Sequence, residues 1–164
     1  MATKFRIVKG AYHKDMPLVR LEFDKIIRPL YGCQLKALKQ IELSTDRRCE
    51  LLLDENDVPC GVLVYKTGFQ NEYRQFGVIN SVEIKTLFVI NSFSNRGKGY
   101  GQILLDKVFN YAKSIGAQGI HVTVGDKVPQ SIRFLKKNNF KILHSWKGRY
   151  LPGVDEHLLY WESQ

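Results

Sequence analysis

The chain has 164 residues, of which 44% are hydrophobic and 25% are charged. This length and composition are typical of one globular domain spanning residues 1–164, and they exclude a disordered chain and a bundle of membrane-spanning helices. The 25 basic residues outnumber the 16 acidic ones, giving a formal net charge of +9, so we expect the protein to attract anions such as phosphorylated cofactors, RNA or acidic proteins. The basic N-terminal segment lacks the apolar run and small-residue cleavage site of a signal peptide. These features predict a cytoplasmic protein with no membrane partner.

The cysteines and histidines give no sign of a metal or disulfide framework. Cys33, Cys49 and Cys60 have neither an even count nor the paired spacing of zinc ligands. We interpret them as reduced thiols in or near the core. The four histidines are scattered along the chain, and we expect no metal site. His121 in particular is interpreted as a hydrogen-bonded packing residue within a strand.

The first half of the chain predicts a strand, two helices and a β-hairpin. Pro17 opens a helical pattern that we expect Pro29 and Gly32 to end. A cluster of turn-forming residues at 54–59 joins two β-rich runs into an antiparallel pair. The predicted elements are a strand at 5–8, helices at 17–27 and 34–43, and strands at 49–53 and 61–66.

The second half begins with a long strand and then alternates helices with strands. From Gly101 the apolar period becomes helical, with Leu104, Val108, Ala112 and Ile115 in one stripe. The predicted elements are strands at 81–90, 119–124, 140–144 and 157–161 and helices at 101–115 and 129–138. This order predicts an α/β (α+β) fold, a mixed and mostly antiparallel sheet of about seven strands with helices on both faces.

A glycine-rich segment lies between the predicted strand ending near Ile90 and the following helix. It consists of Arg96, Gly97, Lys98, Gly99, Tyr100 and Gly101. Its glycines allow backbone N–H groups to turn towards one point, and the helix N-terminus adds its dipole and its unsatisfied N–H groups. With the charges of Arg96 and Lys98, this segment suits a pyrophosphate. The structural alternative is a plain connector with two solvated basic side chains.

Two other phosphate-binding motifs do not fit this segment. It lacks the Gly-Lys-Ser/Thr ending of a P-loop. Its strand-to-helix unit follows an antiparallel hairpin, and no acidic ribose partner stands at the distance typical of dinucleotide-binding folds. Nucleoside triphosphate and dinucleotide binding are therefore disfavoured.

The sequence resembles the GNAT superfamily of acyl-CoA-dependent N-acyltransferases. Arg96, Gly99 and Gly101 match its signature Arg/Gln-x-x-Gly-x-Gly/Ala, which opens the helix after a long central strand. Ser131–Phe140 looks like the second family signature, a short helix running into a turn and then Phe. The resemblance follows the element order over most of the chain and is specific in sequence between about Glu83 and Phe140.

The resemblance implies a GNAT-like fold split between the fourth and fifth strands, with acetyl-CoA in the gap. The diphosphate is then expected on the segment from Gly97 to Gly101. The pantetheine arm is expected to pair like an added strand with the backbone of Leu87, Phe88 and Val89, where one N–H polarises the thioester carbonyl. An amine acceptor attacks that carbonyl directly.

The sequence departs from the family pattern in three places. The connection before Arg96 is about two residues longer than usual. The backbone N–H that meets the thioester carbonyl can therefore be shifted by two residues from the family position in Leu87–Val89. Val128 replaces an asparagine that is frequent at the start of the short helix. Leu135 stands where the family often has the tyrosine that protonates the departing thiolate.

These departures leave the proton-transfer groups to be found elsewhere. Glu83 precedes the Leu87–Val89 strand end as the strand glutamate does in the histone-acetyltransferase branch, so we predict it as the base. The alternative is a surface-facing glutamate paired with Lys85 or Arg74. Tyr150 and Tyr12 are the candidate proton donors, and Tyr150 is the one assigned to the site.

The acceptor is predicted only as a primary amine on a protein or peptide, a small molecule or an aminoacyl-tRNA. Two loops mix aromatic and basic side chains, a combination found in RNA-binding surfaces but also in ordinary loop anchors and homodimer contacts. The alternative function is a non-catalytic nucleic-acid- or CoA-binding module on the same fold. The loop residues are Phe69, Tyr73, Arg74 and Phe76 in one loop and Trp146, Lys147, Arg149 and Tyr150 in the other.

Overall fold

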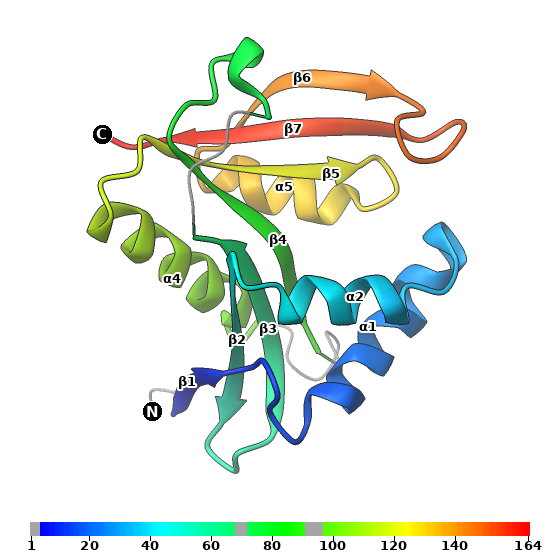
Figure 1. Ribbon diagram of the computed structural model, residues 1–164, viewed down its shortest axis with the longest axis vertical. Helices are drawn as coiled ribbons and strands as arrows, with labels where there is room; N and C mark the ends of the chain where they lie inside the picture. Colours follow the sequence, from blue (N-terminus) through cyan, green and yellow to red (C-terminus); the bar gives the residue numbers. More distant parts are fainter. Residues whose placement is uncertain (1–3, 68–71, 91–96) are drawn as a thin grey trace. The chain divides into compact units, whose positions relative to one another are not determined.

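Seven strands form a mixed sheet in the order β1-β2-β3-β4-β5-β7-β6 in the computed structural model, which describes residues 4–67, 72–90 and 97–164 (Figure 1). Neighbouring strands are antiparallel except β4 and β5, which run parallel. The strands are β1 (Phe5–Lys9), β2 (Arg47–Asp54), β3 (Pro59–Lys66), β4 (Ser81–Val89), β5 (Gly119–Gly125), β6 (Lys141–Lys147) and β7 (Asp155–Glu162). The described helices are α1 (Met16–Tyr31), α2 (Leu35–Leu43), η1 (Arg74–Phe76), α4 (Tyr100–Ser114) and α5 (Pro129–Lys137). The predicted fold class and element order are confirmed.

Two compact units share the central strand β4. The first unit comprises Met1–Gly68 and Ile84–Val108, and the second comprises Phe69–Glu83 and Phe109–Gln164. Within the second unit, Ser81, Val82 and Glu83 pair in parallel with β5. Within the first unit, Ile84–Val89 pair with β3. The parallel β4–β5 pair is the split that the resemblance implied.

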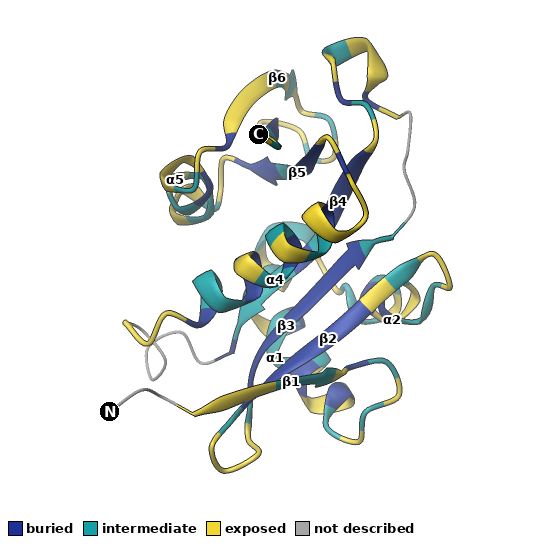
Figure 2. Cartoon of the chain, turned by 90° about the vertical axis from the view of Figure 1, so that its left-hand side faces the viewer, coloured by how far each residue is buried: buried dark blue, intermediate teal, exposed yellow. Residues whose placement is uncertain are grey.

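The sheet of the first unit is covered on both faces. One face packs against α1, and Figure 2 shows the buried strands β2 and β3 beside the helices. On the other face, Leu104 of α4 approaches Gly61, and the Lys107 ammonium lies 3.7 Å from the Glu50 carboxylate. Alternation along β2 and β3 produces these two faces. The core on the α1 side consists of Met16, Val19, Cys49, Leu51, Leu53, Val62, Val64 and Ile90.

The second unit has aromatic clusters that join its strands to the segments around them. Tyr73, Val78 and Leu158 are buried together, with Trp146 and Tyr160 against them. Phe109 of α4 lies 4.8 Å from Trp161 and 6.2 Å from Phe140, measured between ring centroids. These contacts hold the C-terminal end of α4, which belongs to this unit from Phe109 onward, and the 72–80 segment to the β5–β7 sheet.

Three details differ from the prediction. Helix α1 continues through Pro29 and ends at Gly32, whose N–H bonds Arg28 O. A proline removes only one backbone donor, and here this loss falls in the last turn of the helix. Asp24, two turns before the helix end, accepts hydrogen bonds from the Arg28 side chain and from Gln34 N–H, which ties the end of α1 to the start of α2. Ile115, expected in the buried stripe, is 37% exposed because α4 ends at Ser114. Cys33 is exposed, whereas Cys49 and Cys60 are buried.

Gly119→Ala should destabilise the protein strongly because the start of β5 leaves no room for a side chain. A Cβ there would lie 2.3 Å from the Tyr160 ring and 2.4 Å from Trp161 O. The second contact is backbone and does not relax by rotation, so we expect a loss of about 3 kcal/mol, the upper end for overpacking. Urea unfolding measures this loss of stability, and adding Tyr160→Ala to the Gly119→Ala variant should restore little of it. An unchanged midpoint would contradict this packing of β5 against β7.

Candidate active site

The glycine-rich segment forms an open helix start at α4. Gly97 and Gly99 have φ of 79° and 76°, in the left-handed region, and among the described residues beyond their chain neighbours no atom lies within 4 Å of where a Cβ would stand. Gly99 O accepts the N–H of Ile103 at 3.0 Å, so Gly99 caps the helix. The N–H groups that precede Ile103 have no acceptor within a helix, and they carry the positive end of its dipole.

The chemistry of this segment fits a diphosphate. Lys98 is exposed and lies 6.0 Å from the Tyr100 ring, and Tyr100 itself is buried, which anchors the first turn. Backbone donors, open space and a lysine ammonium together make an anion cradle. Arg96, which also belongs to the predicted cradle, lies outside the described residues.

The register of β4 separates the three predicted pantetheine-binding residues. Ile90 N–H donates to Cys60 O at 2.9 Å, and Phe88 O faces Gly61 of β3. Residues along a strand alternate in the direction of their N–H and C=O groups. The backbone groups of Leu87 and Val89 therefore point away from β3, whereas those of Phe88 point towards it.

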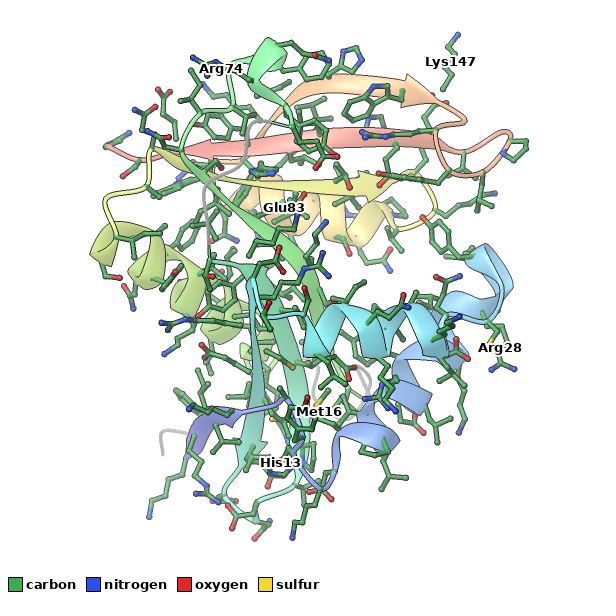
Figure 3. The ribbon with its side chains drawn as sticks, in the orientation of Figure 1. His13, Met16, Arg28, Arg74, Glu83 and Lys147 are labelled. Atoms are coloured by element: carbon green, nitrogen blue, oxygen red, sulfur yellow. The ribbon has the colours of Figure 1, made fainter. Side chains whose placement is uncertain are left out.

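The Glu83 side chain lies in a buried polar chain at the β4–β5 pairing (Figure 3). Its Oε2 atom is 3.4 Å from His121 Nε2, and His121 Nδ1 is 2.8 Å from Ser81 Oγ. Glu83 is 4% exposed and His121 1%. The surface-facing alternative for Glu83 is therefore wrong: the side chain is buried, and parallel pairing places His121 opposite it.

Tyr73 connects this buried chain to the loop that carries Tyr150. The Tyr73 ring meets the His121 ring edge-on at 5.4 Å between centroids. The Arg149 guanidinium lies 5.4 Å from the centre of the Tyr73 ring and 5.2 Å from that of Tyr150. Burial raises the pKa of Tyr73, with Glu72 adding to it, so its hydroxyl stays protonated. The two residues predicted as catalytic, Glu83 and Tyr150, thus lie at the ends of one connected cluster.

The two aromatic and basic loops pack on each other. Arg149 stacks at 4.0 Å on the Trp146 ring and forms an ion pair with Glu72 at 3.7 Å. Phe76 stacks on His144 at 4.3 Å. This is the loop-anchor interpretation of these side chains; Phe69 lies outside the described residues.

The remaining predicted residues are placed as follows. Tyr12 is 86% exposed and belongs to the first unit, whereas the Glu83 cluster belongs to the second. Leu135 is buried in α5, and Val128 stands at the N-cap of that helix. Sequence analysis missed the pairing of His121 with Glu83; a polar residue at the matching position of two strands is the only signal that the sequence offered for it.

A model of the Acetyltransferase (GNAT) family matches residues 19–140. The chain therefore belongs to the GNAT family of acetyltransferases, as its two sequence signatures indicated. A search of curated proteins finds no match.

Solved structures of this family share the fold. A GNAT-family putative acetyltransferase from Desulfovibrio desulfuricans has a TM-score of 0.77 and 14% identity, over 97% of this chain and 99% of that one. Arabidopsis thaliana NAA60 in complex with a bisubstrate analogue has a TM-score of 0.75 and 17% identity, over 98% of this chain and 100% of that one. The same plant protein in complex with acetyl-CoA has a TM-score of 0.70 and 18% identity, over 98% of each chain.

Proposed function

We propose that the protein is an N-acetyltransferase that moves the acetyl group of acetyl-CoA to a primary amine. The family supports acetyl transfer, and complexes of a structural neighbour with acetyl-CoA and with a bisubstrate analogue support this donor. The single observation that carries the proposal is the Gly97–Gly101 helix start, whose open backbone follows a strand with outward-facing N–H groups at Leu87 and Val89.

The donor is held by backbone more than by side chains in this proposal. The first-turn N–H groups of α4 and Lys98 bind the diphosphate, with Arg96 as the remaining predicted contact. Leu87 or Val89 donates an N–H to the thioester carbonyl, and this donor is worth most on the developing oxyanion. The backbone of Phe88 points towards β3, so its role in this proposal is packing: its ring stacks on Phe23 of α1 at 4.5 Å between ring centroids. Bound acetyl-CoA supplies the activated acetyl thioester.

The proton on the acceptor amine is the main chemical obstacle. A lysine-type amine of pKa about 10.4 is mostly ammonium at pH 7, and supplying its neutral form costs about 4 to 5 kcal/mol. The buried Glu83 carboxylate beside His121 gives the second unit a group to accept this proton, with Ser81 fixing the other imidazole nitrogen. For an α-amine of pKa near 8 the cost is only about 1 kcal/mol. Tyr150 is proposed as the donor of a proton to the leaving thiolate, since Leu135 has none.

The buried cysteines support direct attack over an acyl-cysteine route. Burial raises the pKa of the Cys49 thiol to about 12 and that of Cys60 to about 11. Neither thiol forms the thiolate that nucleophilic attack requires at neutral pH. An acyl-cysteine route through either of these two thiols is therefore disfavoured, and direct attack predicts sequential kinetics, with both substrates bound before a product leaves.

The proposal is tested by titrating the purified protein with acetyl-CoA and following CoA release with a panel of amines. We expect a saturable binding heat and amine-dependent release of CoA, with the amine acetylated at nitrogen by mass spectrometry. Lysine peptides, free α-amino termini, small amines and aminoacyl-tRNA form the panel. Salt-sensitive RNA binding that CoA does not compete with, and no transfer to any amine, would overturn the proposal in favour of a binding module.

A further inference from the structure

A second polar chain lies on the β5–β7–β6 sheet, away from the Glu83 chain. Ser145 Oγ is 2.6 Å from His157 Nδ1, and His157 Nε2 contacts Asp126 Oδ1. Ser145 and His157 are cross-strand partners on β6 and β7, and Asp126 follows directly after β5. Its backbone N–H bonds Asp155 O at 2.9 Å, which fixes Asp126 against β7.

This chain lies on the opposite face of the sheet from the Glu83 cluster. Successive side chains along β7 point to opposite faces of the sheet. Leu158 and Tyr160 face the aromatic cluster with Tyr73, so His157, one residue before Leu158, points to the other face. The Ser145–His157–Asp126 group is therefore separate from the proposed acetyl-transfer residues. Ser145 is exposed, and His157 is 16% exposed, so the hydroxyl is accessible while the ring is sheltered.

The three groups have the hydrogen-bond order of a nucleophile, a base and an orienting carboxylate. The Asp126 carboxylate only accepts, so it fixes the proton of neutral His157 on Nε2. His157 Nδ1 is then left as the acceptor of the Ser145 O–H proton. The roles match those of a Ser-His-Asp triad, which is recognised by geometry and not by chain order, with the two ring nitrogens exchanged.

We infer that Ser145 is a nucleophile that takes an acyl group from activated esters. Ser145 Oγ attacks the ester carbonyl carbon, and its proton passes to His157 Nδ1. The bond to the leaving oxygen breaks, and His157 returns the proton to that oxygen, leaving an acyl-serine and a free alcohol. Water then attacks the acyl-serine with His157 as the base, giving the carboxylic acid and restoring Ser145.

The probes for this site are 4-nitrophenyl acetate and a fluorophosphonate, which reacts with activated serines. We expect release of nitrophenol, a mass gain of one acetyl group, and both labels on the peptide that contains Ser145. Ser145→Ala should reduce labelling to background, and His157→Gln and Asp126→Asn should slow it by at least about tenfold. Ser114→Ala is the matched control, because Ser114 is also exposed but its hydroxyl donates to Tyr111 O at 2.7 Å.

The outcomes separate this inference from the acetyltransferase proposal. Labelling that persists in Ser145→Ala, or maps to another residue, would overturn it, as would equal rates in wild type and His157→Gln. Acetyl-CoA binding by Ser145→Ala should equal that of wild type whichever result is obtained, because Ser145, His157 and Asp126 belong to the second unit and the Gly97–Gly101 helix start belongs to the first. Thermal unfolding of each of these variants tests whether the fold is retained.

Discussion

Gly99→Glu should weaken acetyl-CoA binding by at least about 100-fold, measured by isothermal titration calorimetry. The substitution places a carboxylate at the N-terminal turn where the diphosphate is proposed to sit. Juxtaposed like charges cost several kcal/mol, and each 1.4 kcal/mol is a factor of ten in affinity. Because φ is 76° at Gly99, the side chain also brings backbone strain of roughly 1–2 kcal/mol.

Gly116→Glu separates these two causes. Gly116 follows the other end of the same helix, has φ of 67°, and likewise has open space where a Cβ would stand. The control therefore carries a similar backbone strain without a charge at the helix start. We expect it to lower the unfolding midpoint while leaving the affinity for acetyl-CoA unchanged. Equal affinities of the two variants would remove the diphosphate from the Gly97–Gly101 turn.

Glu83→Gln should lower kcat by about 100-fold at pH 7 with a lysine-type amine, the lower range for general base catalysis. The isosteric amide keeps the volume of the buried side chain but removes its capacity to take a proton. Between pH 7 and pH 9 the neutral fraction of an amine of pKa about 10.4 rises by roughly 100-fold, so the difference from wild type should shrink towards pH 9. The measurement is kcat against pH for both proteins.

Glu50→Gln is the matched control because Glu50 is another buried strand glutamate, 9% exposed, that accepts the Tyr65 hydroxyl at 2.6 Å. It should keep the wild-type pH profile. His121→Gln should reproduce the profile of Glu83→Gln, and the double variant should cost little more than either alone, since residues acting as one unit are not additive. A ratio to wild type that stays flat across pH would remove Glu83 as the base.

Local patterns predicted most of the secondary structure, and they are the basis of the proposed donor site. The alternation in Ser81–Ile90 and the helical period from Gly101 depend on neighbours along the chain, so they are readable without the fold. The Gly97–Gly101 turn is equally local. Pro29 misled the prediction because a helix end tied down by Asp24 tolerates the lost donor, and that tie comes from Gln34 in the next helix.

By itself, the sequence determined the element order, the family signatures and the helix start that we propose for the diphosphate. The tertiary structure alone decided which polar side chains meet: Glu83 with His121, Tyr73 with Arg149, and Ser145 with His157 and Asp126. The physical reason is strand register. A shift of one residue moves every side chain of a strand to the other face, and register is set by packing between segments that are distant in the chain.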